Sequence, residues 1–277
     1  MPAPEPVVRA GAQLGEGPVW DPAAGRLLWV DILGSKIHSY DPGSGDQVLH
    51  TTPSHVGAVR PRRGGGLVVN LVEGIGLYGE DGAFTLLAEL TAEGVRGNDA
   101  TVDADGALWA GTMRYDEAAG GGRLYRLDPA GKVSTVLDSV TVSNGIGWSP
   151  DGRSMYYVDS PTRRVDVFTV GDDLADIRDR RPFAAVDGLP DGLTVDAEGC
   201  VWVAVWEGGR VIRFTPSGAV DRVIEIPVAR TTACAFGGPG LHDLYVTTGS
   251  GGGEPDQGAL WVVPDAGEGV LSHAFAG

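Results

Sequence analysis

The sequence of 277 residues has few residues of the kinds that crosslink a chain or place it in a membrane. It contains two cysteines, Cys200 and Cys234, both among small and apolar neighbours, and no paired spacing predicts a disulfide framework or a zinc knuckle. The N-terminus lacks a basic start followed by an apolar run, and no stretch of about 18 apolar residues occurs. We therefore expect a cytoplasmic protein with no membrane partner.

Positive charge is also scarce. The chain has 21 Lys and Arg against 37 Asp and Glu, a net charge of −16, and such a surface repels the phosphates of nucleic acids. Helical periodicity is missing too: residues 171–181 are the only weakly helical stretch, and we interpret them as a charged loop between strands. The sequence contains no G-x-S-x-G elbow, P-loop or H-E-x-x-H motif, so none of the enzyme classes that use them is indicated.

Glycine is abundant, with 44 residues, and it punctuates a phrase that recurs six times. Each copy has a polar residue, a small residue, an apolar strand, a turn and a second apolar strand. The copies begin at Glu16, His55, Asn98, Asn144, Asp191 and Thr232, at spacings of 39 to 47 residues. A period in the low forties with several short strands per unit is typical of β-propellers. We predict an all-β protein, a six-bladed β-propeller forming a single domain over residues 1–277.

A short β-prone segment, residues 6–10, precedes the first copy. We expect it to pair with the last blade, because this pairing would close the ring and remove an open sheet edge.

The six leading residues of the copies should converge, because the innermost strand of each propeller blade lines the central channel. Any one of them could be an ordinary turn former. Glu is not a turn former, however, and six polar residues in one register favour a shared site. Glu16 and Asp191 offer carboxylates, and Asn98 and Asn144 offer amide oxygens, which suit Ca²⁺, Mg²⁺ or Mn²⁺. Two neighbouring buried carboxylates repel each other unless a cation lies between them, so we predict one divalent ion in the channel.

Several phrases resemble one known family: GEGPVWD from Gly15, RGND from Arg96, AGTM from Ala110, SNGIGWSPDG from Ser143, PDGLTVD from Pro190 and ACAFGGPGLHDLYVTT from Ala233. Over nearly its whole length the chain is similar to the senescence marker protein/regucalcin/gluconolactonase family. The resemblance implies a six-bladed propeller with a single divalent metal ion bound by Glu16, Asn144 and Asp191. It also implies substrate contacts from Arg96 and Asn98. Calcium is our first choice of ion among calcium, magnesium, manganese, zinc and iron.

The activity expected from this resemblance is that of a gluconolactonase-like hydrolase in carbohydrate metabolism, which opens a small sugar lactone with the help of a divalent ion. The ion would polarise the lactone carbonyl, and Asp191 would be the catalytic residue that orients the attacking water or accepts its proton. Alternatively, Asp191 only positions the water. Two further interpretations stay open: an esterase or organophosphate hydrolase of the same fold, and a calcium-binding propeller without catalysis.

One segment departs from the family pattern. Residues 114–123 form a shorter loop than the one that carries an acidic residue near the substrate in regucalcin-like members. Asp116 or Glu117 could take that part, and the sequence does not decide between them.

Overall fold

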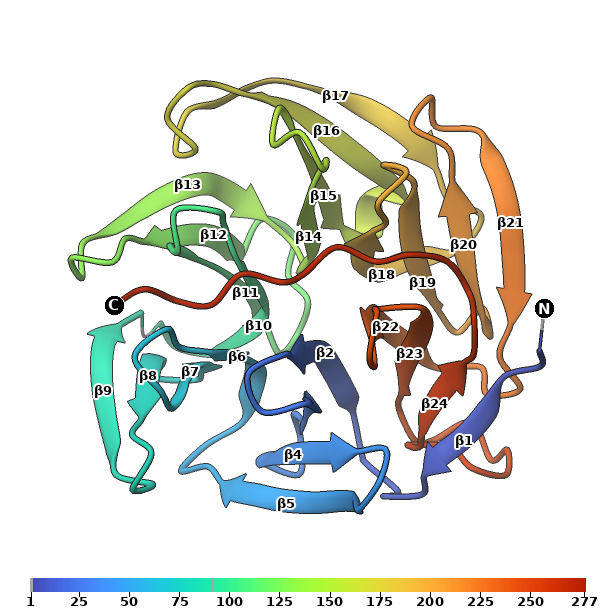
Figure 1. Ribbon diagram of the computed structural model, residues 1–277. Coiled ribbons are helices and arrows are strands. Elements are labelled where there is room, and N and C mark those ends of the chain that lie inside the picture. Colours follow the sequence, from blue (N-terminus) through green and yellow to red (C-terminus); the bar gives the residue numbers. More distant parts are fainter. Residues whose placement is uncertain (1, 91) are drawn as a thin grey trace.

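The computed structural model describes residues 2–90 and 92–277, and its regular secondary structure is almost entirely β-strand. Six four-stranded antiparallel sheets stand around a common axis like the blades of a propeller (Figure 1). Within the described residues the only helical element is one 3₁₀ turn, η1 (Ser160–Thr162), and no helix is long and apolar enough to span a membrane. The all-β, six-bladed fold expected from the repeats is confirmed.

Five blades follow the chain order from the channel outwards. They consist of β2 (Gly15–Asp21), β3 (Arg26–Asp31), β4 (Lys36–Asp41) and β5 (Gly45–Thr51); β6 (Val56–Pro61), β7 (Leu67–Leu71), β8 (Gly74–Tyr78) and β9 (Phe84–Glu89); β10 (Val95–Val102), β11 (Leu108–Arg114), β12 (Gly122–Leu127) and β13 (Val133–Val140); β14 (Ser143–Trp148), β15 (Ser154–Asp159), β16 (Arg164–Val170) and β17 (Ile177–Ala185); and β18 (Leu189–Val195), β19 (Val201–Trp206), β20 (Arg210–Phe214) and β21 (Val220–Glu225).

The sixth blade closes the ring with strands from both ends of the chain. It consists of β22 (Thr231–Gly237), β23 (Asp243–Thr248), β24 (Leu260–Val263) and, at its rim, β1 (Glu5–Val8). β1 pairs antiparallel with β24, as expected for the segment before the first copy (Figure 1). The last blade thus gains its fourth strand, and β24 has no open edge.

The hydrophobic core lies between the blades. Six clusters of buried side chains each join two neighbouring blades, and the indoles of Trp29, Trp109 and Trp202 are fully buried in them or beside them. The outermost strands are much more exposed: five of the six residues of β9 are exposed, whereas every residue of the innermost strand β2 is buried. The channel-lining strands therefore belong to the buried part of each blade.

The C-terminal segment after β24 crosses the ring (Figure 1). The Gly269 N–H donates to Leu241 O near the last blade, and the Phe275 N–H donates to Pro61 O in the second. The Phe275 side chain is fully buried between the second and third blades. The segment therefore connects opposite sides of the propeller.

Residues 171–181 are only partly the loop that the sequence suggested, because β17 begins at Ile177. β17 is an outermost strand, and its alternating charges lie on an exposed edge: Arg180 pairs with Asp166 of the neighbouring β16 at 2.7 Å. Charged residues are compatible with such an edge strand, so their density was a poor guide to a loop.

Candidate active site

Four of the six leading residues line one cavity of about 160 Å³. Glu16, Asn98, Asn144 and Asp191 come from β2, β10, β14 and β18, and Arg96 of β10 lines the same cavity. Each of the five side chains belongs to a residue that is at most 7% exposed. The structure thus brings together all five residues that the sequence singled out, and their roles as ligands and substrate contacts stay predictions.

A β-bulge at each of these positions aims the side chains. The register of β2 against β3 shifts between Glu16 and Val19, and the other three strands shift at the corresponding places. A bulge bends its strand and redirects side chains, which explains why residues within a ladder point into the channel. Glycine after the leading residue lets the strands approach closely: a Cβ on Gly145 would lie 2.7 Å from Asp191 O.

The other two leading residues do not line this cavity, so the expected convergence of all six is wrong. His55 is half-buried just before β6, and its Nδ1 lies 2.7 Å from the Tyr115 hydroxyl. Thr232 is fully buried, and its hydroxyl donates to Gly15 O at 2.6 Å. The short Thr232 side chain donates its hydroxyl hydrogen to the neighbouring backbone. It therefore connects two inner strands and does not reach the cavity.

A chain of hydrogen bonds runs along the cavity wall from the third blade to the fourth. Arg96 Nη1 donates to Asn98 Oδ1 at 2.7 Å, and Asn98 Nδ2 donates to Asn144 Oδ1 at 2.7 Å. Asn144 Nδ2 then donates to Ser160 Oγ at 2.7 Å. The bond to Ser160 fixes the orientation of the Asn144 amide, and its oxygen, which accepts one hydrogen bond from Asn98, has a second lone pair that can bind a cation.

The two buried carboxyl groups of the cavity, those of Glu16 and Asp191, interact unfavourably. Burial, and then the negative charge of Asp99, raise the pKa of Glu16 to about 8. Burial, and then the charge of Glu16, raise the pKa of Asp191 well above its ordinary value. Two buried carboxylates of this kind are stabilised by a cation, and the available donors are all oxygen atoms. The donor set of Glu16, Asn144 and Asp191 therefore fits a hard divalent ion.

A buried ion pair, which sequence reasoning missed, lies close to these carboxylates. Arg60 Nη1 donates to Gly17 O at 3.0 Å, and Arg60 Nη2 lies 3.4 Å from Asp99 Oδ1. Both residues also line a second cavity, of about 190 Å³, which residues 270–273 of the C-terminal segment help to enclose. Asp99 occupies the place at which β2, β14 and β18 have glycine, and this departure from the repeat was the available signal.

The remaining walls of the active-site cavity include residues that the sequence left undecided or did not single out. Met113 and Glu117 line the cavity, whereas exposed Asp116 forms an ion pair with Arg114 at 2.8 Å. Ser160 of η1 and Trp206 at the end of β19 also contribute. Ser160 directly follows the second strand of its blade, and Trp206 ends the second strand of the next blade. The repeat pattern pointed only to the start of the first strand in each blade, so it did not indicate these two residues.

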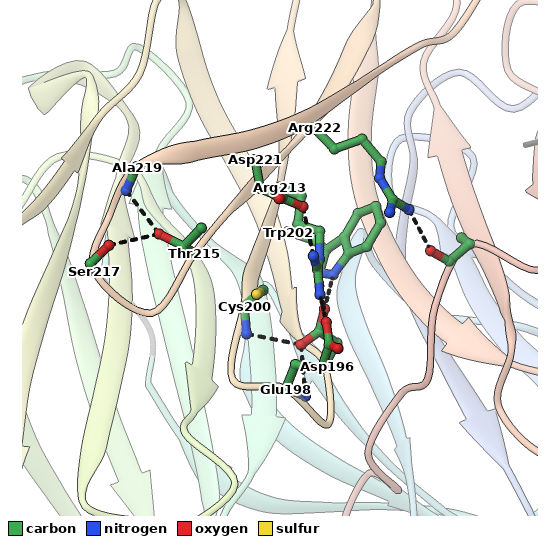
Figure 2. A network of polar contacts seen from close by, with 11 residues as sticks. Asp196, Glu198, Cys200, Trp202, Arg213, Thr215, Ser217, Ala219, Asp221 and Arg222 are labelled. Atoms are coloured by element: carbon green, nitrogen blue, oxygen red, sulfur yellow. Dashed lines mark hydrogen bonds and ion pairs between the residues drawn. The ribbon is translucent and has the colours of Figure 1, made fainter.

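A second group of possible metal ligands, Asp196, Glu198 and Cys200, lies just after the C-terminal end of β18, whereas Asp191 lies near the start of this strand. Figure 2 shows that the carboxylates of this group form hydrogen bonds and ion pairs with neighbouring protein groups. Asp196 accepts hydrogen bonds from the Trp202 indole at 2.8 Å and from Arg213 Nε at 2.9 Å, and Arg213 also pairs with Glu198. Asp103, Trp109 and Arg126 repeat this arrangement in the third blade. The cluster is consequently a structural element of the blade.

The fold and the cavity define a class of protein: six-bladed propellers with a buried, oxygen-rich polar site between their inner strands. Residues 14–250 match the family described as SMP-30/Gluconolactonase/LRE-like region, and the chain belongs to this family.

Individual relatives cover nearly the whole chain. Pentonolactonase XacC of Haloferax volcanii is 37% identical over 255 residues, 91% of this chain and 87% of that protein. Regucalcin of Xenopus laevis is 34% identical over 293 residues, 99% of this chain and 98% of that protein. Among solved structures, regucalcin from Agrobacterium tumefaciens, described as a calcium-binding protein, matches with a TM-score of 0.93 at 29% identity, covering 99% of this chain and 97% of that one. The resemblance inferred from the motifs is confirmed.

Proposed function

We propose that the protein is a divalent-metal-dependent hydrolase that opens a sugar lactone. The observation that carries this proposal is the convergence of Glu16, Asn144 and Asp191, with Arg96 and Asn98 beside them, in one buried cavity. The pentonolactonase among the relatives supports a sugar lactone as the substrate, and family membership supports the assignment of the residues.

Glu16, Asn144 and Asp191 would hold the ion. When bound, a divalent ion supplies Lewis acidity that polarises the lactone carbonyl. We propose calcium as the ion, because the donors are two carboxylates and one amide oxygen and because the Agrobacterium relative is described as calcium-binding.

Asp191 is the proposed catalytic residue. Its carboxylate would orient a water molecule and accept the proton that the water loses as its oxygen attacks the lactone carbonyl carbon. The bond between the carbonyl carbon and the ring oxygen then breaks, and the proton passes to the ring oxygen that leaves as an alkoxide. The product is an open-chain hydroxy acid.

Arg96 and Asn98 would bind the hydroxyl and ring oxygens of the lactone. The guanidinium offers several hydrogen-bond donors in a rigid fork, and only some of them are used by Asn98 Oδ1 and Gly97 O. A polyol presents donors and acceptors in several directions, and an arginine next to an amide matches both.

The experiment is a hydrolysis screen with chelator-treated protein to which Ca²⁺, Mg²⁺, Mn²⁺ or Zn²⁺ is returned. Pentonolactones, hexonolactones, an aryl ester and a phosphotriester serve as substrates. We expect metal-dependent opening of the lactones, its loss in Glu16→Gln, and full activity in the control Asp116→Asn, whose carboxylate is exposed and paired with Arg114. A higher kcat/KM on the ester or the phosphotriester would favour the alternative hydrolase. Thermal stabilisation by the metal without any turnover would favour a calcium-binding propeller.

A further inference from the structure

Asn70 is a buried polar side chain that belongs to a different blade from the substrate-binding residues and does not line their cavity. It lies on β7 of the second blade and is 1% exposed. Its amide nitrogen donates two hydrogen bonds, to Asn98 O at 2.9 Å and to Gly111 O at 2.8 Å. Both acceptors belong to the third blade, so a single side chain connects the two blades.

The two carbonyl groups lie on facing strands at the bulge of the third blade. The register of β10 against β11 passes from Gly97 opposite Thr112 to Ala100 opposite Ala110, which leaves Asn98 and Gly111 outside the regular ladder. Buried carbonyl groups that lose their ladder partners need other donors. The Asn70 amide supplies both donors and thereby holds the two strands together where the bulge would otherwise weaken them.

The position of Asn70 also accounts for Gly97 between Arg96 and Asn98. A Cβ on Gly97 would lie 2.7 Å from Asn70 Oδ1 and 2.7 Å from Leu71 O. No described residue forms a hydrogen bond to Asn70 Oδ1, so this oxygen packs against the Gly97 backbone without a donor. The side chain thus restrains the segment from Arg96 to Asn98 by the hydrogen bond to Asn98 O and by direct packing, and its second hydrogen bond, to Gly111 O, ties it to the facing strand.

We infer that Asn70 is a positioning residue that fixes the bulge carrying Arg96 and Asn98 and so sets the geometry of substrate binding. This inference rests on the proposed function of those two residues. Asn98 uses its side chain to contact Arg96 and Asn144, so a shift of its backbone moves the Arg96 guanidinium directly. Asn144 has its own support from Ser160 Oγ at 2.7 Å, which makes the metal ligands less dependent on Asn70.

The test compares two variants of the position with a matched control. Asn70→Leu keeps the branched shape without any donor, and Asn70→Asp keeps the size but replaces the amide nitrogen that donates both hydrogen bonds by an oxygen. Thr247→Val is the control: Thr247 is likewise fully buried on a second strand and donates to the backbone of an inner strand, at Ala233 O, but it is remote from Arg96 and Asn98 in the ring.

We expect both Asn70 variants to lower kcat/KM on the best lactone about tenfold to a hundredfold, mainly through KM, as a displacement of binding groups does. Calcium affinity, measured calorimetrically, should stay at the wild-type value, and Thr247→Val should change neither quantity. A wild-type KM in Asn70→Leu or Asn70→Asp would overturn the inference. So would a parallel loss of calcium binding, because it would show a general effect on the channel.

Hydrogen exchange gives a measurement that does not depend on activity. In Asn70→Leu, amide exchange should become faster in residues 95–114, which include the bulge and its partner strand, and Thr247→Val should leave that region unchanged. If the wild-type protein opens no lactone, the proposed function fails, but the exchange comparison still tests whether Asn70 holds the bulge in place. Unchanged exchange in residues 95–114 would overturn the positioning role itself.

Discussion

Metal binding at Glu16 and Asp191 should depend steeply on pH, because protons and the cation compete for the same carboxylates. In the metal-free protein, burial and then the charge of Asp99 raise the pKa of Glu16 to about 8. The pKa of Asp191 is raised as well, first by burial and then by the charge of Glu16. Below pH 8 the pair therefore holds at least one proton that the cation has to displace.

The size of the effect follows from the pKa of Glu16. Protonation of a ligand with a pKa of about 8 weakens the apparent affinity by about 1 + 10^(8−pH), which is about tenfold at pH 7 and about a hundredfold at pH 6. A glutamate with its ordinary pKa of 4.5 would leave the affinity nearly constant over the same range. The Kd for calcium should consequently rise about tenfold for each unit of pH below 8.

The same shift sets the pH dependence of stability without metal. The Glu16 carboxyl titrates near 4.5 in the unfolded chain and near 8 in the folded one, so the folded state binds more protons between these values. Its contribution to stability is fully present below pH 4.5 and is lost as the pH rises through 8, at about 1.4 kcal/mol per pH unit. Bound calcium should remove this loss, because it stabilises the charged form.

The assay is a calorimetric titration of calcium into chelator-treated protein at pH 6, 7 and 8, each in two buffers with different ionisation enthalpies. We expect about one proton to be released per ion at pH 6. Glu16→Gln should bind calcium weakly and with a smaller pH dependence. The control Asp116→Asn should behave like the wild type, because hydrogen bonds from Arg114 lower the pKa of Asp116 to about 2. A calcium Kd that is constant from pH 6 to 8, with no proton release, would refute this reasoning.

Three other changes test the site and the fold. Arg96→Lys keeps the charge but loses the fork that reaches Asn98 Oδ1, so KM for the lactone should rise about tenfold while calorimetric calcium binding persists; unchanged kinetics in Arg96→Ala would remove Arg96 from the substrate site. Asp191→Asn should lose at least about a hundredfold in kcat even at saturating calcium, and rescue by excess calcium would leave Asp191 as a ligand only. Phe275→Ala should lower the free energy of unfolding by about 3–5 kcal/mol in urea denaturation, since this side chain is fully buried; a loss below about 1 kcal/mol would show that the C-terminal segment contributes little to the core.

The fold was predictable because its signals are local and repeated. Each copy of the phrase contains a buried inner strand, a turn rich in glycine and a second strand, and these features follow from side-chain alternation and turn chemistry. The charged segment before β17 shows the limit of this reasoning. Its residues up to 176 form the connection, but from Ile177 onwards the exposed edge of a blade tolerates the same charges that suggested a loop.

That Glu16, Arg96, Asn98, Asn144 and Asp191 lie together was predictable from register and family resemblance, whereas the shape of their cavity was not. The register predicted the same environment for His55 and Thr232 as for Glu16. A phenol from the third blade lies against His55, and the backbone of the first blade accepts the hydroxyl hydrogen of Thr232. Both outcomes depend on which neighbour lies within hydrogen-bond distance, and a repeat pattern does not contain that information.

The number of blades, the strand that closes the ring, and the inner positions of Glu16, Asn144 and Asp191 could all be predicted from the amino-acid sequence. These follow from a repeated register in which each unit folds on its own neighbours. The pairing of Arg60 with Asp99 and the contact of Asn70 with the bulge at Asn98 depend instead on how the blades pack together. The partners of Asn70 lie 28 and 41 residues away in another blade, and their approach depends on the bulge geometry and packing of two sheets. Such contacts have no period along the chain, so they become visible only when the blades are assembled.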